Sequence, residues 1–342
     1  MNKILRLFDE EFVLTYLKSK LLPLYLAFKD IGRVEIEPYK KMVWETTYHV
    51  VICFHVYFLA ATGKEVKIPI VCSAHSDEPR ENVFLALNYL WAKKFPRNGI
   101  DLPRPLFYSE QFNGTFYRAL RGKNLLHYIK QKDFLEVEKV VVAAARLFAK
   151  LHALPAGTEA NFNPINSRIR TVIPGTTVIF QEMTARYGDK YSSDLENIYA
   201  YFIKQEEKFF NSTAPLKLIH GDAHSENIIK TAANRIGIID FTDLCLGDFA
   251  RDIGTFLQQL EYKIVVKASD QEYAVKMKKL FLDSYLAAAG LILDNNLQAR
   301  IDLYYNWTAI RTATYWFLKF GHNEERAEAL LKMVKTNLKL ER

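Results

Sequence analysis

Apolar positions in the first third of the chain follow first a helical and then a strand-like spacing. Up to about residue 30, Val13, Leu17 and Leu21 recur at the intervals that place side chains on one face of a helix. Runs rich in β-branched and aromatic residues at 46–58 and 66–72 then predict two long strands. The pattern therefore predicts an N-terminal helix followed by an antiparallel meander.

A helix and a hairpin complete this part of the chain. Pro79 suits the first turn of a helix whose apolar stripe runs over 83–91. Asn113-Gly114 separates two apolar runs, at 106–112 and 115–120, and that dipeptide between such runs is a strong hairpin signal. Residues 34–36 alternate as in a first, short strand, and residues 37–45, which contain no glycine, are expected to connect it to the strand at 46–58.

From residue 122 onward the spacing is mostly helical. Helices are expected at about 125–129, 134–154, 248–260, 271–288, 297–320 and 323–340. Gly321 is expected to end one helix and Asn323 to cap the next. The chain is thus predicted to have an α+β fold with two domains, a small antiparallel β-rich one at 1–121 and a larger, mostly helical one at 122–342.

Composition is that of a globular protein. Of the 342 residues, 49% are hydrophobic and 25% charged, which is enough to build about two cores. The most apolar run, 48–61, is too short to span a bilayer, and the acids at 9–11 come too early for a secretory signal. We therefore expect no membrane segment.

The cysteines indicate a reducing compartment. Cys53, Cys72 and Cys245 are few, odd in number and without CxxC spacing, so neither a disulfide framework nor a zinc site is expected. A cytoplasmic location fits this usage.

A net charge of +7 raises the question of a nucleic-acid partner. The lysines are dispersed, however, and those at 332, 335 and 339 recur at helical spacing, as on a solvated helix face. Since no recognisable binding motif accompanies the charge, we expect no nucleic acid among the partners. A nucleotide or phosphate substrate accounts for the basic excess as well.

The most informative stretch, 218–229, contains Asp222 and Asn227 and is followed by a second apolar strand and Asp240. A carboxylate just after a strand can accept the proton of a substrate hydroxyl. Carboxamide and carboxylate oxygens are ligands that suit Mg²⁺. Each residue alone is most simply a turn residue, but their joint occurrence in one compact hairpin favours phosphoryl transfer.

This hairpin resembles a known family. The residues His-Gly-Asp-Ala-His-Ser-Glu-Asn at 220–227 are similar to the catalytic loop of the aminoglycoside phosphotransferase and choline kinase family, which has the protein-kinase-like fold. Segments 151–155, 239–241 and 247–252 resemble other parts of that family. The resemblance implies a two-lobed molecule, with a nucleotide-binding N-terminal lobe and a C-terminal lobe for catalysis and substrate binding.

The resemblance also implies a role for each polar residue. Asp222 would be the catalytic base, Asn227 and Asp240 would hold Mg²⁺, and ATP or GTP would be the phosphate donor. Three residues would support the catalytic loop: His220 by bonds within it, Asp252 by bracing it, and Asp248 by capping the following helix.

The N-terminal half departs from the family at the nucleotide site. The family places a lysine on its third strand, whereas 66–75 is apolar in the middle, with Lys67 early and His75 late. The glycine-rich loop is also absent from 37–45. The nucleotide-binding residues therefore stay unassigned, and candidates for the phosphate contacts are Lys40, Lys41, Lys67 and His75.

Two functions from different classes are compatible with this pattern. The first is an ATP- or GTP-dependent phosphotransferase that uses an aspartate base and Mg²⁺ on a hydroxyl of an aminoglycoside-, choline- or sugar-like metabolite. The alternative is a catalytically inactive kinase-like protein that binds a nucleotide or another ligand. The joint presence of Asp222, Asn227 and Asp240 favours the enzyme. Aromatic residues of the C-terminal helices would line either its substrate pocket or the core: Tyr262, Tyr304, Tyr305, Trp307 and Trp316.

Overall fold

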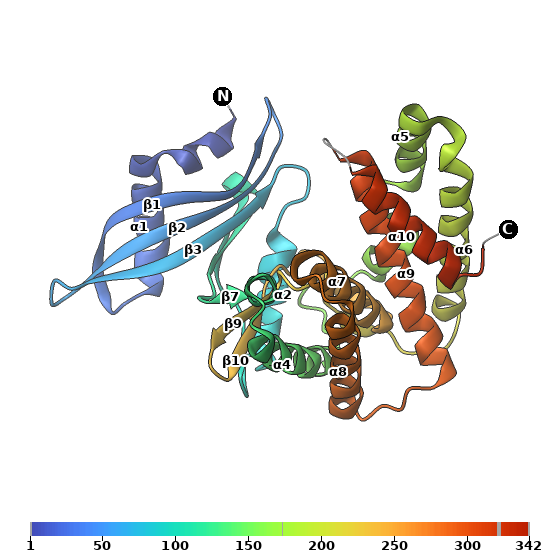
Figure 1. Cartoon of the computed structure of the whole chain (residues 1–342). Helices are drawn as coiled ribbons and strands as arrows, with labels where there is room; N and C mark the ends of the chain where they lie inside the picture. Colours follow the sequence, from blue (N-terminus) through green and yellow to red (C-terminus); the bar gives the residue numbers. More distant parts are fainter. Residues whose placement is uncertain (1, 173, 320–322, 341–342) are drawn as a thin grey trace. The chain divides into compact units, whose positions relative to one another are not determined.

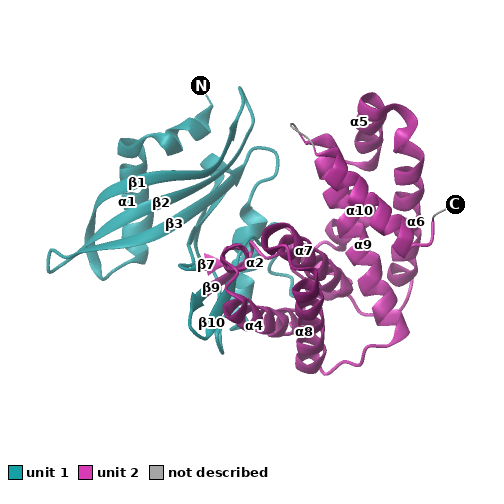
Figure 2. Ribbon diagram, viewed as in Figure 1, with its two compact units in different colours: residues 1–122, 157–161, 231–242 teal, residues 123–156, 162–230, 243–342 magenta. Residues whose placement is uncertain are grey.

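The computed structural model of the chain describes residues 2–172, 174–319 and 323–340, which form two compact units (Figure 2). Unit 1 comprises Met1–Gly122, Gly157–Asn161 and Thr231–Thr242. Unit 2 comprises Lys123–Ala156, Phe162–Lys230 and Asp243–Arg342. Two short segments that follow residue 122 in the sequence thus pack with the N-terminal part of the chain.

Unit 1 is built on a five-stranded antiparallel sheet of order β1-β2-β3-β6-β5 (Figure 1). Its strands are β1 (Phe28–Val43), β2 (Tyr48–Ala60), β3 (Glu65–His75), β5 (Arg104–Ser109) and β6 (Gly114–Arg118). Alternation along β2 and β3 buries every second side chain, from Val50 to Phe58 and from Ile68 to Ala74. These side chains share a core with α1 (Glu10–Leu21), so one face of the sheet is apolar and covered.

Shorter elements complete unit 1: the 3₁₀ turns η1 (Lys3–Phe8), η2 (Leu22–Leu24) and η3 (Glu110–Phe112), helix α2 (Glu81–Ala92), and strands β4 (Ile100–Asp101) and β10 (Arg235–Ile238). Strand β10 pairs with β4 in parallel, with Ile236 opposite Ile100. This pairing ties the segment that carries Asp240 to unit 1. The predicted hairpin is confirmed, because β5 pairs with β6, and Asn113 adopts a φ of 45° just before Gly114.

Two predictions near the N-terminus are wrong in detail. The helical region is shorter than predicted, since β1 already begins at Phe28. Residues 37–43 are strand rather than connection, because β1 stays paired with β2 as far as Val43. A shift in register between Pro38 and Lys40 accommodates the proline on this edge strand without ending it.

Unit 2 is mostly helical, and its elements are β7 (Lys123–Asn124), α3 (Leu125–Gln131), α4 (Phe134–His152), η4 (Pro164–Ser167), η5 (Ile169–Thr171), α5 (Thr176–Tyr187), η6 (Gly188–Lys190), α6 (Ser192–Phe210), β8 (Lys217–Ile219), β9 (Ile228–Ala232), β11 (Cys245–Gly247), α7 (Ala250–Ala268), α8 (Gln271–Ala289), α9 (Asn295–Leu318) and α10 (Glu324–Asn337). Helix α7 packs against α8 and α9, α4 packs against α8, and α10 packs against α9. The last two residues of β9 belong to unit 1.

The mixed fold, with its antiparallel N-terminal sheet and helical C-terminal part, is as predicted. Side-chain caps set several helix starts: Asp270 accepts the Tyr273 N–H, and Asn323 accepts the Arg326 N–H as predicted. Gly321 lies outside the described residues. Helices α5 and α6 were not predicted. Among the helices described, none has both the length and the apolar character needed to cross a membrane.

Candidate active site

The catalytic-loop sequence lies in unit 2, directly after β8. That strand pairs with β11, with Ile219 opposite Cys245, and α7 begins three residues after β11 ends. Asp252, in the first turn of α7, turns back to the loop: its carboxylate accepts the backbone N–H of His220 at 2.6 Å and of Gly221 at 2.9 Å. The loop backbone is therefore fixed by a fully buried carboxylate.

A histidine from a distant helix orients this carboxylate. His152, the last residue of α4, lies between Asp252 and α8: its Nε2 is 3.1 Å from Asp252 Oδ2, and its Nδ1 is 2.8 Å from the Tyr285 hydroxyl. Burial raises the pKa of Asp252, but the bonds from His152 and the loop outweigh it and lower that pKa below its usual value. Asp252 is therefore an anion, with hydrogen bonds to both of its oxygens.

The position before the candidate base can hold only glycine. Gly221 has a φ of +83°, and a Cβ there would lie 2.4 Å from the Asp243 carbonyl oxygen. Both the left-handed backbone and the close approach exclude a side chain. His220, beside it, is completely buried. The turn into Asp222 is thus tightly constrained.

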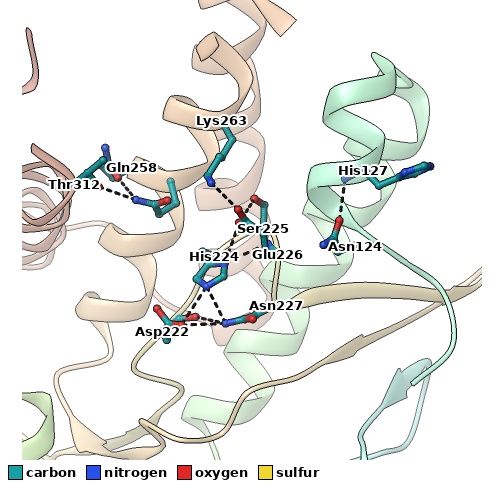
Figure 3. Close-up of polar contacts among 11 residues, drawn as sticks. Asn124, His127, Asp222, His224, Ser225, Glu226, Asn227, Gln258, Lys263 and Thr312 are labelled. Carbon is teal, nitrogen blue, oxygen red and sulfur yellow. Dashed lines mark hydrogen bonds and ion pairs between the residues drawn. The ribbon is translucent and has the colours of Figure 1, made fainter. Parts of the chain in front are cut away.

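Asp222 is the first member of a chain of alternating charges (Figure 3). Its Oδ2 lies 3.1 Å from His224 Nε2, His224 Nδ1 lies 3.0 Å from Glu226, and Glu226 lies 2.6 Å from Lys263 on α7. Burial lowers the pKa of His224, but the two carboxylates outweigh it and raise the pKa to about 9. His224 is therefore a cation at neutral pH.

That cation keeps Asp222 ionised. Burial raises the pKa of Asp222, but the bond and charge of His224, with smaller contributions from His220 and Arg311, bring it far below its usual value. The Asp222 side chain is 37% exposed, so its carboxylate can still be reached from outside. It is consequently a permanently charged hydrogen-bond acceptor at neutral pH.

Asn227 is held against Asp222 by its amide nitrogen. Asn227 Nδ2 donates to the Asp222 backbone oxygen at 2.9 Å and lies 3.3 Å from Asp222 Oδ2. Because the nitrogen end is used inside the loop, the amide oxygen is the end available to a cation. The structure thus brings Asp222 and Asn227 together, as their spacing predicts.

Asp240 belongs to unit 1 and follows β10 at an exposed position. Its φ of 64° lies in the left-handed region, which non-glycine residues adopt rarely and mostly as Asn or Asp. Thr242 donates a hydrogen bond to Asp240 Oδ1 at 2.9 Å. Such a conformation directly after a strand is frequent at functional sites.

Asp248 lies at the start of α7. Its Oδ1 accepts the Ala250 N–H at 3.0 Å and also contacts Arg300 of α9. Burial raises the pKa of Asp248 to about 6, although Arg300 and the backbone bond act in the opposite direction. The contacts of this side chain are thus with the helix end and with α9.

A pocket of about 370 Å³ opens beside Asp222, within unit 2. Its lining residues come from the catalytic loop, α7 and α9: Asp222, His224, Thr255, Gln259, Tyr262, Lys263, Thr308, Arg311, Thr312, Tyr315 and Trp316. The size suits a small metabolite. Among the lining residues that the structure describes, Asp222 is the one acid, beside the basic residues His224, Lys263 and Arg311.

The aromatic residues divide between pocket and core. Tyr262 and Trp316 line the pocket and are joined by a hydrogen bond of 2.8 Å from the indole N–H to the phenol. Tyr304 and Trp307 are buried in the core instead, and Tyr305 donates a hydrogen bond to Glu261. Sequence spacing could not separate the two groups, because all of them lie on α7 or α9.

Comparison with known proteins identifies the family. A model described as the phosphotransferase enzyme family matches residues 70–291, which include the whole catalytic loop. The chain belongs to this family. No curated protein matches the chain. The matched segment starts within β3 and ends before α9, so β1, β2, α9 and α10 lie outside it.

Solved structures of small-molecule kinases share the fold. An ethanolamine kinase from Plasmodium vivax superposes with a TM-score of 0.55 at 16% identity, covering 95% of this chain and 86% of that one. An amicoumacin kinase in complex with AMP-PNP and Ca²⁺ gives 0.55 at 13%, covering 96% and 93%. The aminoglycoside phosphotransferase APH(4)-Ia gives 0.54 at 12%, covering 92% and 98%. The predicted protein-kinase-like fold is therefore confirmed.

Proposed function

We propose that this protein transfers the γ-phosphate of ATP or GTP to a hydroxyl group of a small metabolite. The observation that carries the proposal is the ionised Asp222, held by His224 and Asn227 at the wall of a pocket of about 370 Å³. All three cysteines are buried free thiols, which supports a cytoplasmic site of action.

Asp222 would act on the acceptor hydroxyl. Phosphoryl transfer usually passes through a loose transition state, in which the nucleophile loses its proton late. A carboxylate with a low pKa suits this task, because it is always ionised and orients the hydroxyl by accepting its hydrogen bond. His224 and Asn227 fix the carboxylate, while the bond from Asp252 to the loop backbone sets the loop's conformation.

Asn227 and Asp240 would hold the magnesium ion. Both offer hard oxygen atoms, and the amide nitrogen of Asn227 is already engaged, which fits a role for its oxygen. Magnesium bound there would offset the charge of the nucleotide phosphates. The AMP-PNP and Ca²⁺ in the structure of the amicoumacin kinase support a nucleotide with a divalent cation.

The pocket favours an uncharged or anionic acceptor. Its lining offers the hydroxyl and amide groups of Thr255, Gln259, Thr308 and Thr312, which suit a polyhydroxyl compound. Arg311 adds a positive charge that would attract a carboxylate or phosphate on the acceptor. The positive charge of Arg311 would repel an aminoglycoside or another amine, and Asp222 is the one acid among the described lining residues that could pair with it.

The aromatic pocket residues Tyr315 and Trp316 are also poorly suited to binding a quaternary ammonium group. Lys319 Nζ lies 4.9 Å from the centre of the Tyr315 ring and 5.5 Å from that of Trp316, and the Arg326 guanidinium lies 5.5 Å from the Trp316 ring. The positive charges of Lys319 and Arg326 already lie beside the aromatic rings that a choline-like cation would contact. We therefore propose a sugar-like acceptor, neutral or acidic, rather than an amino alcohol.

An acceptor screen tests this proposal. Purified protein would be incubated with Mg²⁺, γ-labelled ATP or GTP and four acceptor classes: neutral sugars and polyols, sugar acids, amino alcohols, and aminoglycosides. We expect labelled product with the first or second class. Product with amines alone would contradict the acceptor class, and no transfer in any class with either nucleotide would contradict the proposed activity.

A variant of Arg311 sharpens the test. Arg311→Gln should raise KM for an acidic acceptor about tenfold or more, as expected for a lost charge-assisted bond, and change KM for its neutral analogue far less. Lys319→Gln is a matched control for net charge, because Lys319 does not itself line the pocket, although its ammonium lies over the rings of Tyr315 and Trp316.

A further inference from the structure

Three basic side chains gather on the sheet face of unit 1 that α1 does not cover. Lys40 on β1 pairs with Val51, His49 lies two residues before Val51 on β2, and His49 pairs with His75 on β3. Residues two apart in a strand point to the same face, so these side chains form one row across three strands. All three are half-buried.

The members of this row are in contact. Lys40 Nζ lies 3.1 Å from His49 Nδ1 and 3.3 Å from His49 Nε2, and the rings of His49 and His75 are 4.7 Å apart. Burial, followed by the charge of Lys40, lowers the pKa of His49 to about 4, so the ring is neutral. The Lys40 ammonium thus rests against a neutral imidazole rather than against a carboxylate.

His75 is held in one tautomer. Its Nδ1 accepts the backbone N–H groups of Asp77 and Glu78, each at 3.1 Å. The ring proton must therefore be on Nε2, which makes that atom a hydrogen-bond donor. The loop before α2 consequently turns the donor side of His75 away from its own backbone.

Arg80 adds a buried guanidinium to this region. Its side chain is 8% exposed, one nitrogen pairs with Glu78 at 3.2 Å, and Nε has no hydrogen-bond partner in the part of the chain that the structure describes. A buried donor without a partner is costly. The backbone N–H groups of Arg80 and His75 donate to the same Asn113 carbonyl oxygen, at 3.2 and 3.5 Å, so Arg80 lies beside the row, and its positive charge lowers the pKa of both Lys40 and His49. An anion bound beside Arg80 would accept a hydrogen bond from its Nε–H and would offset the positive charge that lowers the pKa of Lys40 and His49.

Asp240, a proposed ligand of the magnesium ion, also affects the charge of this cluster. Burial lowers the pKa of Lys40, and so does Arg80, whereas the carboxylate of Asp240 raises it. Asp240, Lys40 and Arg80 all belong to unit 1. A site for a cation and a site for an anion within one unit match the two needs of a magnesium–polyphosphate complex.

We propose that Lys40, His75 and Arg80 bind the phosphate groups of the donor nucleotide, and so replace the missing strand lysine and glycine-rich loop. This inference rests on the proposed function, because it concerns the same donor. The Lys40 ammonium, the His75 ring N–H and the free Nε–H of Arg80 supply donors of the kind that phosphate oxygens accept.

The other candidate lysines are engaged elsewhere. Lys41, next to Lys40, points to the opposite side of the strand and lies 4.3 Å from the Phe8 ring. Lys67 lies 3.5 Å from Glu35 and close to the Tyr57 ring, on the exposed part of β3. Both are therefore suitable control positions.

Calorimetric titration of the full chain with ATP and with AMP, in the presence of Mg²⁺, tests the site; if the wild type binds GTP instead of ATP, GTP and GMP take their places. Lys40→Met should weaken ATP binding at least tenfold and AMP binding much less, because the contacts concern the outer phosphates. Arg80→Gln should act in the same direction. Lys41→Met and Lys67→Met should bind both nucleotides within about twofold of wild type, which controls for net charge.

Lys40→Met is the deciding variant, because Arg80 is also the N-cap residue of α2 and its loss could disturb folding. Weakened ATP binding by Lys40→Met and not by Lys41→Met supports the inference. Equal binding by wild type, Lys40→Met and Lys41→Met refutes it while leaving the proposed phosphotransferase intact. Absence of ATP and GTP binding by the wild type would instead overturn the nucleotide-dependent function together with this site.

Discussion

Replacing His224 by Gln should remove a pH-dependent contribution to stability. In the folded protein the carboxylates of Asp222 and Glu226 raise the pKa of His224 from about 6.5 to about 9. A raised pKa means that the folded state binds the proton more tightly than the unfolded state does. The stabilisation is therefore complete below pH 6.5 and is lost as the pH rises through 9.

The size of this contribution follows from the shift. Since one pKa unit corresponds to about 1.4 kcal/mol, a shift of roughly 2.5 units gives about 3 kcal/mol for the free energy of unfolding. The His224 side chain is 24% exposed, so solvent screening should reduce this value only in part.

Urea unfolding between pH 6 and pH 9.5 would measure the contribution of His224 to the free energy of unfolding, with wild type and His224→Gln compared at each pH. The difference between the two free energies should shrink by a few kcal/mol over this range, because the other titrating groups are common to both proteins. NMR of the His224 ring gives an independent reading, with a midpoint expected near 9. Parallel stability profiles together with a midpoint at or below 6.5 would refute the reasoning.

Three further predictions concern the loop and the metal. Gly221→Ala should reduce turnover at least tenfold, because the added Cβ would meet the Asp243 carbonyl oxygen at 2.4 Å; unchanged turnover would show that the turn is not constrained. Asp252→Asn should lower the free energy of unfolding by about 2–4 kcal/mol in urea, since it breaks the buried pair with His152 and weakens two backbone bonds; a change below 0.5 kcal/mol would contradict the bracing role. Asp240→Asn should raise the Mg²⁺ concentration needed for half-maximal transfer about tenfold, and an unchanged metal requirement would exclude Asp240 as a ligand.

Much of the fold was predictable because its signals are local. The alternation along β2 and β3 and the helical periods of α4 and α8 appear directly in the sequence, and the elements follow them closely. Only the alternating part of β1 at 34–36 was predicted as a strand, because Pro38 and the lack of apolar alternation after Ile36 conceal the rest, which pairing with β2 sustains. Its register shift depends on tertiary context.

In the candidate site, too, some residues could be found from the sequence and others are brought together only by the fold. Asp222 and Asn227 are five residues apart, so a motif finds them, and their contact in the structure is local. The pair of His152 with Asp252 spans 100 residues, and the pocket wall joins α7 to α9. Such contacts exist only after folding. His224 stands in the motif itself, and its position between two acids was the signal that could have predicted its charge.

The role of the Asp222 carboxylate in phosphoryl transfer can be measured by comparing wild type with Asp222→Asn. Single-turnover phosphoryl transfer would be measured for wild type and Asp222→Asn with saturating Mg²⁺–nucleotide and the best acceptor, alongside nucleotide affinity. We expect Asp222→Asn to bind nucleotide within about twofold of wild type but to transfer phosphate about 10²–10⁴-fold more slowly. Transfer at the wild-type rate by Asp222→Asn would contradict this role.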